Sequence, residues 1–292
     1  MAYKTGIQWT EATWNPWHGC KKVSPGCKYC YMFRGKEQYK QDPTLVQRSK
    51  TRFNDPLKWT DPRLIFPCSW SDFFIKEADV WRAEAWRIIE STPHFYQILT
   101  KRAERIEDNL PLYNQPDHWA HGLPYIPRNV LLGISAENQE ELEARVPIVE
   151  SFGRKGMNCK WWISAEPLIG PMPNLNDWLV DIDLGDEDHS HWTKPPAWVV
   201  VGGESGHDKG KYRYRECKIE WIESIVDQCR SYGVPVFVKQ LGTHLAKKLG
   251  LKDRAGGDPG EWPEHLRVRE MFDGFAEWDQ KRKAVKLVST NK

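Results

Sequence analysis

The chain has 292 residues, of which 40% are hydrophobic, 42 are basic and 40 are acidic, so its formal net charge is only +2. A chain of this length can bury a full core, and single α/β barrels commonly span about 200–250 residues. The near balance of charge excludes binding to nucleic acid or membranes through an overall electrostatic field, so such a partner would need a local patch. No apolar stretch has the length of a signal peptide or a membrane span, which predicts a cytoplasmic protein without a membrane partner.

Short apolar runs alternate with segments of helical period along most of the chain. A weak run from Ile7 to Thr10 predicts a first strand. Six stronger runs predict further strands, at residues 64–66, 95–99, 130–134, 161–163, 198–201 and 234–238.

Three segments between these strands have the spacing of amphipathic helices. One runs from Trp81 to Ile89, one is opened by the cap pair Asn138 and Glu141, and one is closed by Gly233. Apolar strands joined by helices predict a parallel sheet that curls into a partial (β/α) barrel. We expect this α/β barrel to span residues 1–245, interrupted by an acidic insertion at 174–196, and to be followed by a C-terminal extension at 246–292.

Three of the seven cysteines, Cys20, Cys27 and Cys30, lie within eleven residues of a loop rich in Gly and Pro. Their thiolates can converge on one metal centre without a long-range chain closure. A [4Fe–4S] cluster held in this way keeps one iron open, whereas His18 as a fourth ligand would complete a zinc site in a nucleic-acid-binding module. The other cysteines lack this spacing and are expected to be buried, with Cys68 set apart by its place at a strand end.

The segment Cys27-Lys28-Tyr29-Cys30 resembles the end of the radical S-adenosylmethionine (SAM) signature, in which an aromatic residue precedes the third cysteine. The first spacing differs, because six residues separate Cys20 from Cys27 where most of that superfamily has three. A wider resemblance, from about residue 7 to 245, is to a phage-associated three-cysteine-motif family that is similar to radical SAM proteins. Six ordered blocks carry it: Trp9–Pro16, Gln97–Arg102, Gly133–Gln139, Ser164–Leu168, Val201–Gly206 and Lys239–Gln240.

The resemblance implies a cluster, held by Cys20, Cys27 and Cys30, whose open iron binds SAM. An electron from an external donor would then cleave SAM and release a 5′-deoxyadenosyl radical that abstracts a substrate hydrogen. On this view Tyr29 lies beside the adenine of SAM. The association with phages favours a nucleotide or a nucleic-acid base as the substrate, by analogy alone.

Polar and charged residues follow the predicted strands, and in parallel barrels such residues gather at one rim. Any one of these residues could simply be a solvated strand end or a helix cap. As a group, charged side chains directly after buried strands are costly unless they are paired or bound to a ligand. We expect Ser71 and Asp72 to receive the amino group of SAM, Lys101 its carboxylate, Ser135 and Glu137 its ribose hydroxyls, and Glu166, Glu204 and Lys239 to orient the substrate as catalytic residues. An alternative is a metal-dependent hydrolase that uses Glu137, Glu166 and Glu204.

Basic and aromatic residues alternate between Arg48 and Arg63, with Phe53 and Trp59 as the rings. Basic groups contact phosphates and rings stack on bases, so this stretch could follow a nucleic acid. An ordinary charged surface anchored by two rings would have the same pattern.

Overall fold

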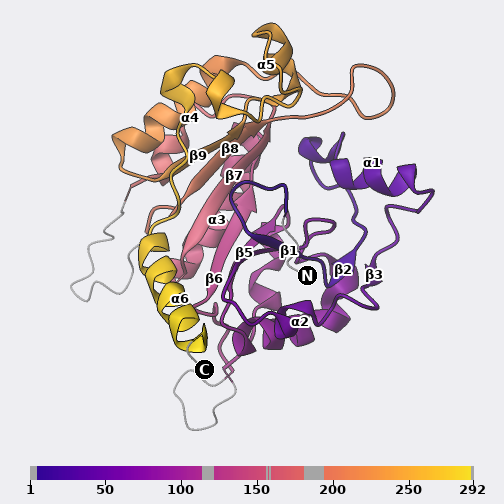
Figure 1. Ribbon diagram of the computed structural model, residues 1–292, viewed down its shortest axis with the longest axis vertical. Coiled ribbons are helices and arrows are strands. Elements are labelled where there is room, and N and C mark those ends of the chain that lie inside the picture. The colour runs from indigo at the N-terminus through magenta and orange to yellow at the C-terminus, as the bar shows by residue number, and fades with distance from the viewer. Residues whose placement is uncertain (1–4, 114–121, 156, 158, 181–193, 291–292) are drawn as a thin grey trace.

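A computed structural model describes residues 5–113, 122–155, 157, 159–180 and 194–290 of the chain (Figure 1). Seven parallel strands form one curled, half-barrel sheet, and they lie side by side in the order of the chain. They are β1 (Ala12–Trp14), β4 (Leu64–Pro67), β5 (Phe95–Thr100), β6 (Val130–Ser135), β7 (Trp161–Leu168), β8 (Val199–Gly203) and β9 (Val236–Gln240). A short antiparallel pair, β2 (Trp17–His18) and β3 (Gln47–Arg48), lies between β1 and β4 in sequence.

The structure confirms the predicted α/β class, the parallel sheet and the six stronger strands. The prediction of a strand from Ile7 to Thr10 is wrong, because this segment bends and the first strand begins at Ala12. Trp9 is nonetheless buried, against Trp162 and Trp198 on one face of the sheet. The alternation of apolar residues in this segment therefore reflects burial and not pairing in a strand.

Three helices cover the other face of the sheet: α2 (Asp79–Ser91), α3 (Gln139–Arg154) and α4 (Ile219–Ser231). Their apolar stripes pack on strand residues such as Ile65, Ile134 and Val201 in one continuous core. The predicted cap of α3 is confirmed, since the Asn138 side chain accepts a hydrogen bond from the backbone N–H of Glu141. The Glu141 carboxylate pairs with Arg145, one helical turn further on.

The chain after residue 246 packs onto the barrel. Beyond α5 (Gly242–Lys248), the backbone of residues 268–270 hydrogen-bonds with β9, where the Val238 N–H donates to the Val268 carbonyl (2.8 Å). Phe272 then stacks on Phe95 with ring centroids 5.1 Å apart, in the aromatic cluster that also holds Trp9 and Trp198. The last helix, α6 (Phe275–Thr290), is joined to the start of the chain by the ion pair of Arg282 with Glu11. The C-terminal segment therefore covers the edge of β9 and contributes to the core.

None of the described helices is long and apolar enough to cross a membrane. The acidic residues of the predicted insertion, Asp181, Asp183, Asp186, Glu187 and Asp188, lie outside the described residues.

Candidate functional site at the cysteine loop

A cavity of about 600 Å³ lies at the carboxyl ends of strands β4 to β9, below the cysteine loop. Cavities of this size hold small-molecule ligands and cofactors. Its wall contains eleven of the twelve site residues expected from the sequence: Cys20, Cys27, Cys30, Tyr29, Ser71, Asp72, Lys101, Ser135, Glu166, Glu204 and Lys239. The exception is Glu137, which has no exposed surface and lies behind the wall.

The cysteine loop is fixed by backbone contacts on both sides. Gly19 has a φ of +93°, and a Cβ atom there would lie 2.2 Å from the Leu45 carbonyl oxygen, so only glycine fits. The N–H of Cys20 donates to the Pro43 carbonyl (2.9 Å). Cys27 ends a short 3-10 turn, Pro25–Cys27, and Cys30 directly precedes the helix α1 (Tyr31–Gln38).

An apolar cover lies over the cysteines. Met32 and Phe33, from the first turn of α1, cluster with Tyr212 from the loop after β8, and this cluster packs against Cys20 and Cys30. Burial raises the pKa of Cys30, while the backbone N–H groups of Met32 and Phe33 act in the opposite direction. Burial, together with Asp72, raises the pKa of Cys20 to about 12. Without a metal, both groups are therefore neutral thiols at pH 7, and a metal would have to displace their protons.

The donors on the cavity wall bear on the choice between a single zinc ion and an iron–sulfur cluster. Among the described residues, no three His, Cys, Asp or Glu side chains lie close enough together to hold one metal ion. Zinc ligands at about 2.3 Å from the metal lie within about 4 Å of one another, whereas a cubic cluster spreads three thiolates over three irons. His18 lines a neighbouring cavity, where its Nδ1 is 2.7 Å from Lys36 Nζ.

Arg102 and Asp72 form an ion pair directly beside Cys20. Arg102 Nη1 lies 3.0 Å from Asp72 Oδ2, and both terminal nitrogens lie 3.8 Å from Cys20 Sγ. The Asp72 carboxylate also accepts hydrogen bonds from the Thr100 hydroxyl (2.7 Å) and the Lys101 N–H (3.1 Å). The positive charge of Arg102 favours the thiolate form of Cys20 that would bind iron, while Asp72 opposes it and keeps the pKa of the free thiol high.

Glu137 joins the cysteine loop to the barrel. Its Oε1 accepts hydrogen bonds from Ser24 (2.6 Å) and from Lys101, and its Oε2 accepts one from Arg145 (3.1 Å). Burial opposes ionisation, but Lys101 and Arg145 outweigh it, so the pKa of Glu137 falls below its ordinary value of 4.5. A Cβ atom on Gly26 would lie 2.2 Å from Oε1, so the loop can approach Glu137 only through a glycine.

The remaining strand ends also carry paired charges. Lys239 Nζ donates to Glu166 Oε1 (2.8 Å), across the ends of β9 and β7. Glu204 accepts two hydrogen bonds from the guanidinium of Arg215, at 2.5 and 2.8 Å. Arg215 also donates to the Pro25 carbonyl (2.7 Å), and its guanidinium carbon lies 5.4 Å from the centre of the Tyr29 ring.

These pairs bear on the hydrolase alternative. Glu137, Glu166 and Glu204 are each neutralised by a basic partner of their own, and in the described part of the chain no three acids lie close enough together to hold one ion. The arrangement therefore supplies paired charges around a cavity, and not three carboxylates directed at one ion.

The rings in the basic stretch from Arg48 to Arg63 are structural. Phe53 is only 3% exposed, and the guanidinium carbon of Arg48 lies 3.9 Å from its ring centre. Arg48 also pairs with Glu84, while Trp59 packs against the core. Phe53 is therefore not available to stack on a base.

Sequence reasoning missed four residues that build the site: Ser24, Arg102, Arg145 and Arg215. Arg102 directly follows Lys101 at the end of β5, so its place at a strand end was a usable signal. Arg145 lies two turns after the cap of α3 on the side that faces Glu137. Ser24 and Arg215 lie in loops without periodicity, and only the folded chain brings them to Glu137 and Glu204.

Comparison with known proteins places the chain in one family. A family model described as "Protein of unknown function (DUF5131)" matches residues 4–286. No curated protein and no solved structure gives a significant match. The matched segment contains the half-barrel, the three cysteines and the whole wall of the cavity. The chain therefore belongs to the DUF5131 family.

Proposed function

We propose that this protein is a radical SAM enzyme, in which Cys20, Cys27 and Cys30 hold a [4Fe–4S] cluster at the mouth of a partial barrel. The observation that carries the proposal is that three thiols and the ends of six parallel strands line a single cavity. Three thiolates leave one iron of a cluster open to a ligand, and the strand ends supply charged groups that can hold that ligand.

When bound, the cluster would pass one electron from an external donor to SAM, and the cleavage would yield methionine and a 5′-deoxyadenosyl radical. The side chains around it have supporting tasks. Arg102 favours the thiolate form of Cys20 by its positive charge. Met32, Phe33 and Tyr212 pack against Cys20 and Cys30 and reduce their exposure to water. The free thiols of the chain suit a reducing compartment, in keeping with a cytoplasmic enzyme.

The polar wall of the cavity can receive the charged end of SAM. Lys101 and Lys239 line it with partly exposed side chains, and a carboxylate of SAM would share one of these ammonium groups with Glu137 or Glu166. Asp72 already accepts hydrogen bonds from Thr100, Lys101 and Phe74. Its capacity for the amino group of SAM is therefore small.

Glu166 has more capacity for that amino group. Its Oε2 has one long contact, 3.4 Å from the Ser164 hydroxyl, and its Oε1 is held by Lys239. Ser135 and Tyr29 remain the residues expected near the ribose and the adenine.

The direct test is SAM cleavage. The protein is reconstituted anaerobically with iron and sulfide, reduced with dithionite and mixed with SAM, and 5′-deoxyadenosine is measured by chromatography. The proposal predicts 5′-deoxyadenosine that requires both the cluster and the reductant. Its absence from protein with a confirmed cluster would refute the proposal.

Two cysteine variants provide the matched control. Cys27→Ala removes a cluster ligand and should abolish both the brown chromophore and 5′-deoxyadenosine formation. Cys229→Ala removes a thiol on the buried face of α4, far along the chain from the loop, and should leave the chromophore intact. Equal loss in both variants would contradict the assignment of the ligands.

A further inference from the structure

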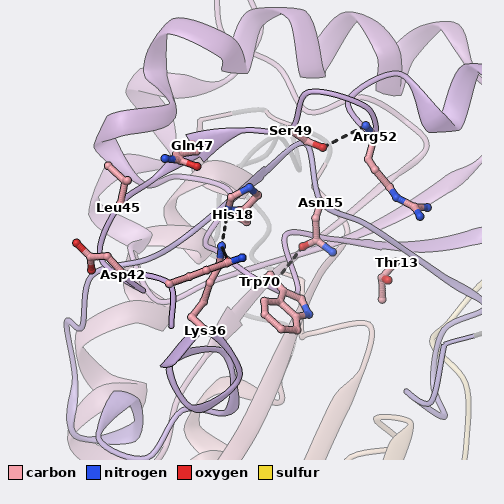
Figure 2. Close-up of a pocket in the computed structure, with 11 residues that line it drawn as sticks. Thr13, Asn15, His18, Lys36, Asp42, Leu45, Gln47, Ser49, Arg52 and Trp70 are labelled. Carbon is pink, nitrogen blue, oxygen red and sulfur yellow. Dashed lines mark hydrogen bonds between the residues drawn. The ribbon is translucent and has the colours of Figure 1, made fainter. Parts of the chain in front are cut away.

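A second cavity, of about 800 Å³, adjoins the cysteine cavity on the side of α1. Figure 2 shows its wall, with Lys36 and His18 directed toward each other and Asn15 beside Trp70. Thr13 and Trp70 line both cavities, so the two spaces share a wall. A substrate that reaches both cavities would therefore have to pass Trp70.

Lys36 is the unusual group in this cavity. The residue is only 5% exposed, and its Nζ donates to Gln41 Oε1 (2.9 Å) and lies 2.7 Å from His18 Nδ1. Both partners are uncharged acceptors when His18 is neutral, and no ion pair joins Lys36 to a carboxylate in the described part of the chain. An ammonium has three N–H donors, so one remains for a ligand.

A buried ammonium group without a carboxylate partner favours the binding of an anion. Burial lowers the pKa of Lys36, because a charged amine without a counter-charge loses hydration and gains nothing in return. Asp42 lines the same cavity with a negative charge, since hydrogen bonds from the Thr44 hydroxyl (2.7 Å) and N–H (2.8 Å) lower its pKa, and it forms no ion pair with Lys36 in the described part of the chain. Arg52 adds a second basic side chain to the wall, and its guanidinium lies 3.5 Å from the Asp55 carboxylate.

The rest of the wall fits the other parts of a nucleotide. Gln41 and Gln47 carry side-chain amides, and such amides pair with base edges. The Asn15 amide is already bound to Ser69 and to the Trp70 N–H. Trp70 contributes an aromatic ring, held in place by Gly35 of α1, where a Cβ atom would lie 2.9 Å from the ring. Lysine serves as a point charge for phosphate, while amides and a ring can recognise a base.

We infer that Lys36 binds a phosphate group of the substrate, either of a free nucleotide or of a nucleic-acid strand, while the reacting part of that substrate lies in the cysteine cavity. This inference rests on the proposed function, because it assigns the phosphate-binding site for the substrate of that same reaction. The binding itself needs neither iron nor SAM.

The test measures binding to the purified chain by calorimetry, with nucleoside 5′-monophosphates, the matching nucleosides and a short single-stranded oligonucleotide as probes. Phosphate-bearing probes should bind, and Lys36→Met should weaken them by about tenfold or more, the usual loss for a charge-assisted hydrogen bond. Lys36→Arg should retain most of the affinity. Binding of monophosphates would identify the ligand as a free nucleotide, and binding of the oligonucleotide alone would identify it as a nucleic-acid strand.

Lys50→Met is the matched control, since Lys50 is an exposed lysine near the same cavity. It should change the affinity by less than about twofold, because exposed charges are screened. Lys36→Gln serves as a second variant that retains polar contacts, and nucleotide should raise the melting temperature of the wild-type protein but of neither neutral variant. Equal losses in Lys50→Met and Lys36→Met would overturn the inference, as would unchanged binding in Lys36→Met or binding of dicarboxylates such as succinate in place of phosphates. Failure here with SAM cleavage intact would leave the proposed function standing, and nucleotide binding without SAM cleavage would refute only that function.

Discussion

The Glu137 carboxylate accepts hydrogen bonds from three side chains, two of them basic. It is fully buried and held by Ser24, Lys101 and Arg145, so it ties the cysteine loop to the strand ends. A carboxylate in this position contributes stability only while it is charged, because its partners are buried with it.

Glu137→Gln should lower the free energy of unfolding by about 3 kcal/mol at pH 7, since Lys101 and Arg145 would lose their counter-charge. The measurement is urea denaturation. Glu107→Gln is the control, because Glu107 pairs with Lys155 at the surface, where both side chains are more than 40% exposed. It should change the free energy by no more than about 0.5 kcal/mol.

The loss of stability in Glu137→Gln should depend on pH. The pKa of Glu137 is lowered in the folded state, so its contribution is complete above the ordinary value of 4.5 and is lost as the pH falls through the lower folded value. The difference between wild type and Glu137→Gln should therefore shrink below about pH 4.5. A constant difference down to acid unfolding would contradict the ionised state of Glu137.

Single residues at the site were predictable where they directly follow a strand. Lys101, Ser135, Glu166 and Lys239 stand at or near the ends of apolar runs, and the structure brings them to one cavity. Their partners were not predictable in the same way. Arg215 reaches Glu204 from a loop, and a hydrogen bond between loops leaves no periodic pattern in the sequence.

At the scale of elements, one of the contacts between the cysteine loop and the barrel leaves no room for a side chain. Gly26, in the turn Pro25–Cys27, lies against the Glu137 carboxylate, which cannot move away because Lys101 and Arg145 hold it. The position of the cysteines therefore depends on a residue without a side chain.

Gly26→Ala should displace the loop, with a strain of about 1–3 kcal/mol, and lower the iron content after anaerobic reconstitution. Iron per chain is measured by colorimetric assay. Gly6→Ala is the control, because a Cβ atom at Gly6 meets no atom within 4 Å. Full iron loading of Gly26→Ala would show that the contact with Glu137 does not position the cysteines.

Strands were predictable from the sequence where the residues that pair in the sheet are also buried. The strands from β4 to β9 are apolar on both faces, so their runs stand out in the sequence. The strand β1, Ala12–Trp14, is only three residues long, and the longer alternation at Ile7 to Thr10 concealed it. Short strands carry too few residues to show a period.

At the scale of the whole molecule, the C-terminal segment completes the core. Phe272 is 3% exposed and packs between Phe95 and Trp198, on the face of the sheet opposite α2, α3 and α4. The sequence predicted an extension from residue 246, but the long-range pairing of residues 268–270 with β9 has no local signature.

Phe272→Ala should therefore lower the free energy of unfolding by about 3–5 kcal/mol while unfolding stays a single transition. The measurement is urea denaturation followed by tryptophan fluorescence and circular dichroism together. Val80→Ala, at a residue 80% exposed on α2, should change the free energy by no more than about 0.5 kcal/mol. Separate transitions by the two probes, with the main one unshifted, would show that the segment is an independent appendage.

The central claim is that three cysteines hold a cluster with one iron open to SAM. Electron paramagnetic resonance of the reduced, reconstituted protein, recorded with and without SAM, tests it most directly. The account predicts the signal of a reduced [4Fe–4S] cluster in wild type, its loss in Cys27→Ala, and a change of that signal when SAM is added. A cluster signal that SAM leaves unaltered, or no cluster signal in wild type, would contradict it.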